Sequence, residues 1–287
     1  MNRAQVVSLV ETARPEAAPV RNVRQVRAGH THENWRLASA LGELLLKVPL
    51  HQRDPGRLAD VATCSQLAVA AGVPAPEVLA VGDRWLIQRW LPGHAATGTE
   101  PAGFYEGFGR AVGRLHAVRP AHFSHRASEP AAGTDSWARA VATWLAAAAA
   151  DPEVGAGVAR VTYLAFGVAP SVEPGLAHLD LYLPNTLVLR GGFAGLLDFE
   201  HGKLWDPVHD FVKLRWWVFD RHPEAEAPFM SGYRATGPAL PDFEARLHVC
   251  TGMELLAGIG YWRRRGEAQL LEEWRARWLN WLAQAAS

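Results

Sequence analysis

The chain has 287 residues, of which 49% are hydrophobic, and its 29 basic and 29 acidic side chains give a formal net charge of zero. This length and composition predict a folded protein with one large core or two lobes, and exclude a disordered chain. A neutral balance argues against nucleic acid or an anionic membrane surface as the main partner.

Targeting and redox signals point to a cytoplasmic protein. The N-terminus lacks the apolar segment of a signal peptide. No apolar run reaches the roughly 20 residues that cross a bilayer. Cys64 and Cys250 match no metal-ligand spacing, so we expect buried thiols in a reducing compartment.

The first ninety residues predict one helix followed by strands. Apolar spacing predicts a helix over residues 3–13, and alternation predicts strands over 20–28, 35–38 and 43–48. A polar turn, residues 29–34, lies between the first two strands. Lys47 stands alone among apolar neighbours in the third, which indicates either a side chain that snorkels to water or a functional cation.

A second helix and a strand pair complete this region. The helix is predicted over residues 56–71 and ends at Gly72-Val-Pro74-Ala-Pro76. Strands are predicted over 78–82 and 85–91. Pro92-Gly93 then marks the boundary that we expect between an N-terminal lobe, residues 1–92, and a C-terminal lobe, residues 93–287.

The C-terminal lobe is predicted to be mostly helical. Helices are expected over 104–116, where small residues suit close packing, and over 136–150 and 154–168, with a loop at 119–135. The chain after residue 210 has helical spacing almost to its end. Trp274, Trp278 and Trp281 share one helical face and predict core, whereas Trp205, Trp216 or Trp217 could face a cationic substrate.

The stretch His178-Leu-Asp180-Leu-Tyr-Leu-Pro-Asn185 carries the clearest chemistry, together with Asp198 thirteen residues later. Phosphoryl transfer needs one carboxylate to orient a hydroxyl, and an amide and a second carboxylate to hold Mg²⁺. Protein kinases use a similar order, H-R-D-x-x-x-x-N and then D-F-G. The residue types and their spacing therefore predict a kinase-type site.

This stretch resembles the catalytic loop of the aminoglycoside phosphotransferase/choline kinase family of small-molecule kinases. Phe199 fits the aromatic residue that follows the family's metal-binding Asp, and Leu179 replaces a Gly. The segment Asp206-Pro-Val-His-Asp210-Phe resembles the family's D-P-x-x-D-L, whose last Asp braces the catalytic loop. The resemblance implies a two-lobed, protein-kinase-like α+β fold with an antiparallel sheet in the small lobe.

The resemblance also implies roles for individual residues. Asp180 would be the catalytic base, Asn185 and Asp198 the Mg²⁺ ligands, and His178 and Asp210 loop supports. ATP, or GTP, would contact the phosphate-binding residues Lys47, Gly29 and Asn34, with a hinge for the adenine formed by Gln88, Arg89, Trp90 and Leu91.

The helix over 56–71 departs from the family. Members carry a glutamate there that pairs with the lysine, but the corresponding place falls near Val61 or Ala62 and only Asp60 offers a carboxylate. This departure puts the Lys47 ion pair in question.

Other functions stay open. His178, Asp180, Asp198, His201 and Asp210 could instead form a metallohydrolase cluster. A kinase-like binding module without activity is a further alternative, favoured by the missing glutamate. We predict an ATP- and Mg²⁺-dependent phosphotransferase whose acceptor is a small hydroxylated molecule, with or without a cationic centre.

The acceptor has two main candidates. An aminoglycoside-type acceptor is the first, although the C-terminal lobe is not rich in acids. A choline, ethanolamine or thiamine kinase is the alternative, to which Glu200 after Asp198 adds some weight.

Overall fold

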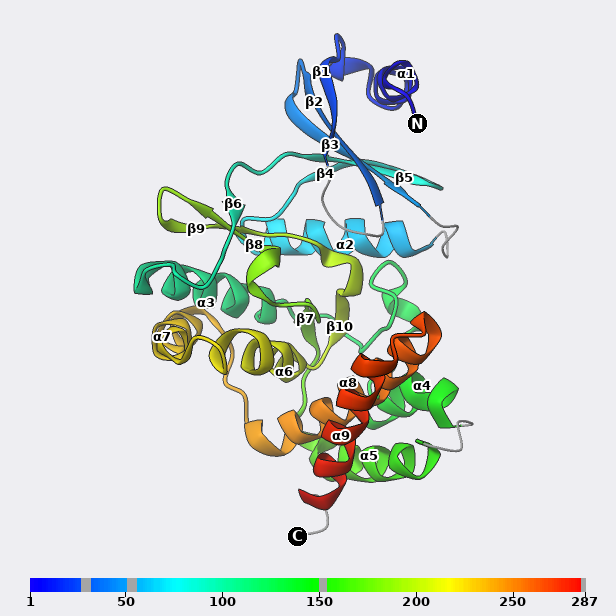
Figure 1. Cartoon of the computed structure of the whole chain (residues 1–287), viewed down its shortest axis with the longest axis vertical. Coiled ribbons are helices and arrows are strands. Elements are labelled where there is room, and N and C mark those ends of the chain that lie inside the picture. Colours follow the sequence, from blue (N-terminus) through cyan, green and yellow to red (C-terminus); the bar gives the residue numbers. More distant parts are fainter. Residues whose placement is uncertain (27–31, 51–55, 150–153, 285–287) are drawn as a thin grey trace.

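The computed structural model describes residues 1–26, 32–50, 56–149 and 154–284. Figure 1 shows a twisted sheet with the N-terminal helix α1 (Arg3–Ala13) at its side and helix α2 (Gly56–Ala70) beneath it, above a larger helical part that ends at the C-terminus. The predicted two-lobed α+β architecture is confirmed. A boundary near residue 92 stays a proposal.

The N-terminal sheet has five strands. They are β1 (Arg21–Val26), β2 (His32–Ser39), β3 (Gly42–Pro49), β4 (Val78–Gly82) and β5 (Trp85–Arg89). Their order is β1-β2-β3-β5-β4, and all neighbours run antiparallel. The prediction was wrong at the start of β2, because Asn34 lies in the strand rather than in a turn. The predicted turn residue Gly29 lies outside the described residues.

The two faces of this sheet have different neighbours. Leu44 and Leu46 are fully buried in a core that they share with Val6 and Val10 of α1. Because side chains alternate along a strand, Lys47 points to the opposite face. That face turns toward α2 and the rest of the chain.

Helix α2 joins the sheet to the helical part. Leu58, Val61 and Ala62 pack against Val78 and Leu86 of the sheet. Farther along α2, buried small residues belong to the large core of the C-terminal part. The helix therefore has apolar contacts on both sides.

The passage to the C-terminal part requires a glycine. Gly93 has φ +134°, and a Cβ there would lie 2.7 Å from the Val188 carbonyl oxygen. Only glycine adopts this conformation at so close an approach without strain.

Two small sheets follow and frame the loops of the site. One contains β6 (His94–Ala95), β8 (Thr186–Leu189) and β9 (Gly192–Leu196), and the other pairs β7 (Gly175–Ala177) with β10 (Lys203–Trp205). Residues 178–185 connect β7 to β8, and residues 197–202 connect β9 to β10. Strand pairing thus brings two loops with predicted site residues together.

The larger part is built from helices. They are α3 (Ala102–His116), α4 (Trp137–Ala149), α5 (Gly155–Val168), α6 (Asp210–Leu214), a π-helical turn (Arg215–Phe219), α7 (Glu226–Thr236), α8 (Phe243–Arg265) and α9 (Ala268–Gln284). A Cβ at Gly109 of α3 would lie 1.9 Å from the Phe229 carbonyl oxygen of α7, so the predicted close packing is confirmed.

The predicted core tryptophans are also confirmed. Trp274, Trp278 and Trp281 of α9 are all buried. Cys64 and Cys250 are buried free thiols, as expected. Among the described residues, no helix is long and apolar enough to cross a membrane.

Candidate active site

The loop after β7 is held in place by one buried carboxylate. Asp210, at the start of α6, accepts hydrogen bonds from the backbone N–H of His178 (2.9 Å) and of Leu179 (2.5 Å). Leu179 has φ +61°, a left-handed conformation that costs a side-chain-bearing residue about 1–2 kcal/mol. The two bonds to Asp210 stabilise this conformation and so set the direction in which Asp180 leaves the loop.

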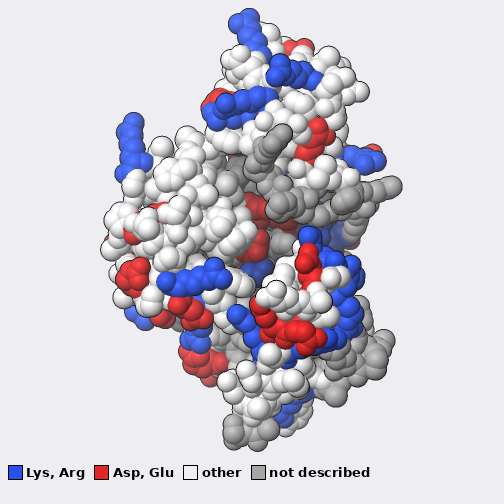
Figure 2. Space-filling view, in the orientation of Figure 1, with Lys and Arg blue, Asp and Glu red and all other residues white. Residues whose placement is uncertain are grey.

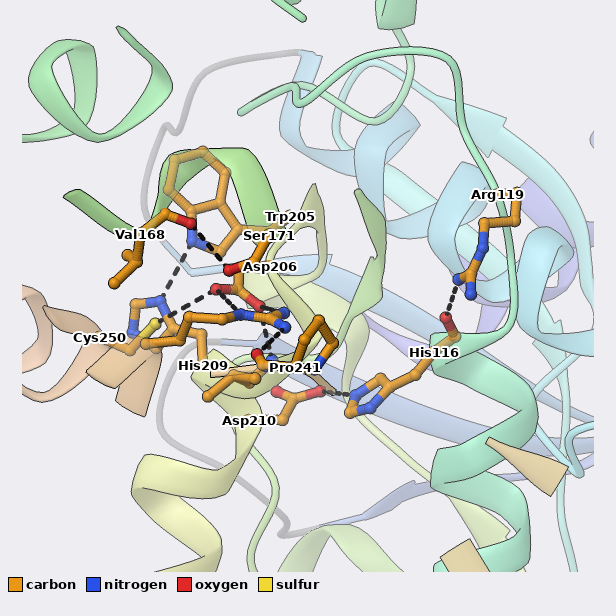
Figure 3. A network of polar contacts seen from close by, with 12 residues as sticks. His116, Arg119, Val168, Ser171, Trp205, Asp206, His209, Asp210, Pro241 and Cys250 are labelled. Atoms are coloured by element: carbon orange, nitrogen blue, oxygen red, sulfur yellow. Dashed lines mark hydrogen bonds and ion pairs between the residues drawn. The ribbon is translucent and has the colours of Figure 1, made fainter. Parts of the chain in front are cut away.

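Asp210 has a third partner, which the sequence did not reveal. His116, the last residue of α3, donates from Nε2 to Asp210 Oδ2 (2.8 Å), and Tyr233 lies 3.1 Å from its other ring nitrogen. Burial opposes ionisation of Asp210, but the His116 bond and the other contacts hold its pKa below the usual value. Figure 3 shows this pair within the surrounding polar network.

His178 links the two loops. Its side chain is buried and donates from Nε2 to the Leu197 carbonyl oxygen (2.8 Å). The next residue after Leu197 is Asp198. These contacts support the predicted role of His178 in shaping the loop.

Asn185 and Asp198 lie next to each other through the backbone. Leu197 donates its N–H to the Asn185 carbonyl oxygen (2.8 Å). Asn185 Nδ2 donates to the Asp180 carbonyl oxygen (3.0 Å) and to Asp180 Oδ2 (2.9 Å), so its amide oxygen is the atom left for a ligand. Asp198, at φ +64°, has a 39% exposed side chain. An amide and a carboxylate oxygen suit Mg²⁺.

Lys47 reaches this pair from the sheet. Its Nζ lies 3.4 Å from Asp198 Oδ1, across 151 positions of sequence. It lies equally far from Glu200 Oε1. Asn34 is directly opposite Lys47 in the register of β2 and β3, so the two side chains share a face. The structure thus brings together Lys47, Asn34 and Asp198.

Asp60 of α2, the carboxylate nearest to the place of the missing glutamate, has partners other than Lys47. Its carboxylate accepts from the Ser128 N–H (3.0 Å) and hydroxyl (2.6 Å) and pairs with Arg126 Nε (2.7 Å). These partners belong to the loop between α3 and α4. Asp60 therefore ties α2 to that loop and does not replace the missing glutamate.

A lysine beside Asp180 was not foreseen. Lys213 of α6 donates from Nζ to Asp180 Oδ1 (2.8 Å) and lies 3.4 Å from Glu254 of α8. Burial disfavours the charged lysine, but the two carboxylates raise its pKa above the usual value. Lys213 and His209 likewise hold the pKa of Glu254 down at about 2 against its burial. Lys213 follows Asp210 by three residues in α6, so both lie on one face of the helix. This spacing was the sequence signal that could have placed Lys213 near the loop of Asp180.

The predicted hinge covers the end of β5 and two residues beyond it. Gln88 is buried in the strand. Arg89 and Trp90 donate their backbone N–H groups to carbonyl oxygens of Glu77 and Glu43, both at 2.9 Å. These two N–H donors are used by the protein itself, and the hinge over Gln88, Arg89, Trp90 and Leu91 stays a prediction.

The tryptophans suggested for a cationic substrate have other roles. Trp205 is fully buried and donates from Nε1 to His209 Nδ1 (3.2 Å), so this suggestion was wrong for Trp205 (Figure 3). The Arg277 guanidinium lies over the rings of both Trp216 and Trp217, at 5.1 and 5.8 Å. The protein's own cation occupies the faces that a substrate cation would use.

A second buried ion pair stabilises the turn that leads to Asp210. Arg246 of α8 bonds both carboxylate oxygens of Asp206, with Nε–Oδ2 at 3.3 Å and Nη2–Oδ1 at 2.5 Å. Both side chains are almost fully buried. Asp206 also caps the turn that leads to Asp210 by accepting from the Val208 N–H (2.9 Å).

The metallohydrolase alternative fails on geometry. The described residues include no group of three or more His, Cys, Asp or Glu side chains that could hold a metal ion. His178 Nε2 and the Asp210 carboxylate are already bonded to backbone groups of the two loops, so neither is available to a metal ion. The site residues lie where the two parts of the molecule meet. Figure 2 shows acidic side chains gathered in a hollow between the sheet part and the helical part, which we call the cleft.

Comparisons with known proteins agree with this geometry. Residues 22–247 match the family described as "Phosphotransferase enzyme family". No curated protein sequence matches the chain.

Solved structures share the fold over nearly the whole chain. The macrolide 2'-phosphotransferase MphH from Brachybacterium faecium has a TM-score of 0.63 at 19% identity, over 94% of this chain and 95% of that chain. A thermostable mutant of the aminoglycoside phosphotransferase APH(4)-Ia, in ternary complex with ADP and hygromycin B, has 0.68 at 16% identity, over 98% of each chain. A putative fructosamine-3-kinase from Thermobifida fusca has 0.71 at 17% identity, over 96% and 99%.

The matched segment spans well over half of the chain and contains Lys47 and the loops of Asp180 and Asp198. The chain therefore belongs to the phosphotransferase enzyme family.

Proposed function

We propose that the protein transfers the γ-phosphate of ATP to a hydroxyl group of a small molecule. One observation carries this proposal: Lys47, Asp198, Asn185 and Asp180 form one connected set of polar contacts although they come from three distant segments. GTP is the alternative donor. The ternary complex of the similar aminoglycoside phosphotransferase with ADP supports a nucleotide in this cleft.

Asp180 is the catalytic base of the proposed reaction. A carboxylate at the end of the loop orients the acceptor hydroxyl and takes its proton as the oxygen attacks. Lys213 and Asn185 contact its two carboxylate oxygens from different sides. These contacts hold the carboxylate in one orientation, and orientation is a large part of catalysis in phosphoryl transfer.

Asn185 and Asp198 are the proposed Mg²⁺ ligands. The oxygen donors fit this hard cation. Asn185 is fixed by its bond to the Asp180 carbonyl oxygen, and Leu197, the neighbour of Asp198, bonds to the Asn185 carbonyl oxygen. When bound, Mg²⁺ would neutralise charge on the phosphates. Lys47 would contact the α- and β-phosphates, Asn34 would line the same face of the sheet, and Leu91 would meet the adenine edge.

The acceptor is proposed to be a polyhydroxylated compound of the antibiotic or sugar type. The names of the similar structures mention a macrolide, hygromycin B and fructosamine, which all offer several hydroxyl groups. A choline, ethanolamine or thiamine kinase is the second candidate. Its support from the tryptophans weakens, because Trp205 is buried and Arg277 covers Trp216 and Trp217.

The experiment is a thermal-shift titration with ATP, GTP and Mg²⁺, separately and together, followed by a coupled assay on both acceptor panels. Nucleotide at about 100 times its dissociation constant adds roughly 2.7 kcal/mol of stability. We expect a shift with ATP that grows with Mg²⁺, and ADP release with one panel. A shift with Zn²⁺ or Mn²⁺ alone, and none with nucleotide, would contradict the proposal.

A further inference from the structure

The nucleotide-facing lysine lacks its expected partner on α2. Asp60 is the only acidic residue in α2, and its carboxylate is bonded to Arg126 and Ser128 in the loop between α3 and α4. Arg57, in the first turn of the helix, adds a positive charge near the cleft instead. The sign of the charge on this part of α2 is therefore opposite to the one that a lysine needs.

Glu200 supplies a carboxylate from another direction. It lies two residues after Asp198, and its side chain is only 7% exposed. Its Oε1 is 3.4 Å from Lys47 Nζ and 2.9 Å from His32 Nδ1. His32 and Lys47 come from the neighbouring strands β2 and β3. One carboxylate thus bridges two strands of the sheet and the loop that carries Asp198.

The carboxylate of Glu200 is enclosed by these partners. It contacts the His32 ring and lies 3.4 Å from the Lys47 ammonium, and only 7% of the side chain is exposed. A buried carboxylate with one oxygen near two donors, as Glu200 Oε1 is, has little freedom to change its rotamer. It can therefore define where the Lys47 ammonium sits.

We propose that Glu200 is the positioning residue for Lys47 and takes over the task of the absent helix glutamate. This inference rests on the proposed function, because it assigns Lys47 to the phosphates of a nucleotide. As a structural consequence, the position of the Lys47 ammonium depends on the loop that carries Asp198 and Glu200, and not on helix α2. A movement of α2 would then leave the phosphate contact intact.

The test is calorimetric binding of ADP and of adenosine, with EDTA present so that no metal contributes. In Glu200→Gln, which keeps the shape and removes the charge, we expect ADP to bind about tenfold more weakly and adenosine to bind as in the wild type. Adenosine has no phosphates, so it reports the rest of the site. The matched control is Asp60→Asn, which removes the carboxylate of α2 and should leave both affinities unchanged.

A double-mutant cycle separates positioning from general electrostatics. In a Lys47→Met background, Glu200→Gln should cause no further loss of ADP affinity, because its effect passes through Lys47. His32→Phe removes the second contact of Glu200 and should weaken ADP binding by a smaller factor. It replaces the Gln variant if that variant does not fold.

Several results would overturn the inference. Unchanged ADP binding in both Glu200→Gln and His32→Phe would show that Glu200 does not position Lys47. Tighter binding would show that its charge repels the phosphates. An equal loss with and without Lys47, or a matching loss in Asp60→Asn, would also contradict it. A wild-type protein that binds adenosine and ADP in no condition would overturn the proposed function together with this inference.

Discussion

The two sides of the cleft hold their charges in different ways. On the helical side, Asp210 receives three hydrogen bonds of 2.5–2.9 Å, and Asp180 is contacted by Lys213 at 2.8 Å. On the sheet side, Lys47 stands 3.4 Å from both of its carboxylate partners. The helical side is therefore fixed before any ligand arrives, whereas the sheet side is held more loosely.

This difference suggests a division of labour. Short, buried hydrogen bonds to ionised groups are roughly twice as strong as neutral ones and allow little adjustment. They suit the base and the loop that carries it, which must be positioned closely for the chemical step. Longer ion pairs around Lys47 leave room for phosphates between the charges. Mutations on the two sides should accordingly affect different quantities.

The largest effect on stability is expected for Asp210→Asn. The asparagine amide has one acceptor oxygen, and its NH₂ group would face the donors that now bind the second carboxylate oxygen. At least one of the buried donors, the N–H groups of His178 and Leu179 and the ring of His116, would then lose its acceptor. Breaking a buried charged network of this kind costs about 3–5 kcal/mol. Urea denaturation measures the loss, and Glu244→Gln is the control, because its exposed pair with Arg215 contributes less than about 1 kcal/mol. Equal values for the two variants would break the comparison.

A smaller effect, mainly on turnover, is expected for Lys213→Met. Without the ammonium, Asp180 and Glu254 become two carboxylates with no cation between them. Turnover should fall about 10- to 100-fold, a loss of roughly 1.4–2.7 kcal/mol of transition-state stabilisation. Nucleotide affinity should not change. Arg215→Met, two residues farther along the chain, is the matched control and should keep wild-type kinetics. A loss of nucleotide affinity in Lys213→Met would argue against separate roles for the two sides of the cleft.

The smallest effect is a pH dependence from His125, in the loop after α3. Burial and the charge of Lys203 lower its pKa below the ordinary value of about 6.5. The unfolded chain then binds a proton that the folded chain resists, so stability is lost as pH falls below about 6.5. His125→Gln, which can still donate to the Ala140 carbonyl oxygen, should reduce the drop in Tm between pH 7.5 and 5.5. If Tm fell by the same amount in the variant as in the wild type, His125 would not be the source of the pH dependence.

The sequence predicted the loops better than their supports. Asp180, Asn185 and Asp198 have local spacing that follows from one loop and one strand pair, and the structure brings them together. The helices up to residue 168 and most strands of the N-terminal sheet followed from periodicity within about two residues at each end, whereas the short strands β6 to β10 were not predicted. The start of β2 was missed, because a polar segment such as His32-Glu-Asn34 resembles a turn until its partner strand is known.

Contacts between distant segments could not be predicted. His116 meets Asp210 across 94 residues, and Glu200 meets Lys47 across 153. Neither leaves a periodic signal, because each depends on how α3, β3 and the loops pack. The sequence showed that the helix glutamate was missing, but only the three-dimensional arrangement identifies Glu200 as the carboxylate beside Lys47.

The most direct test of the central claim compares Asp180→Asn with the wild type in two measurements on the same preparation, nucleotide affinity by calorimetry and turnover by a coupled assay. The account predicts that ATP affinity with Mg²⁺ stays within about twofold, while turnover falls about 100- to 10,000-fold, as for loss of a general base. Turnover close to that of the wild type would contradict the assignment of Asp180 as the catalytic base.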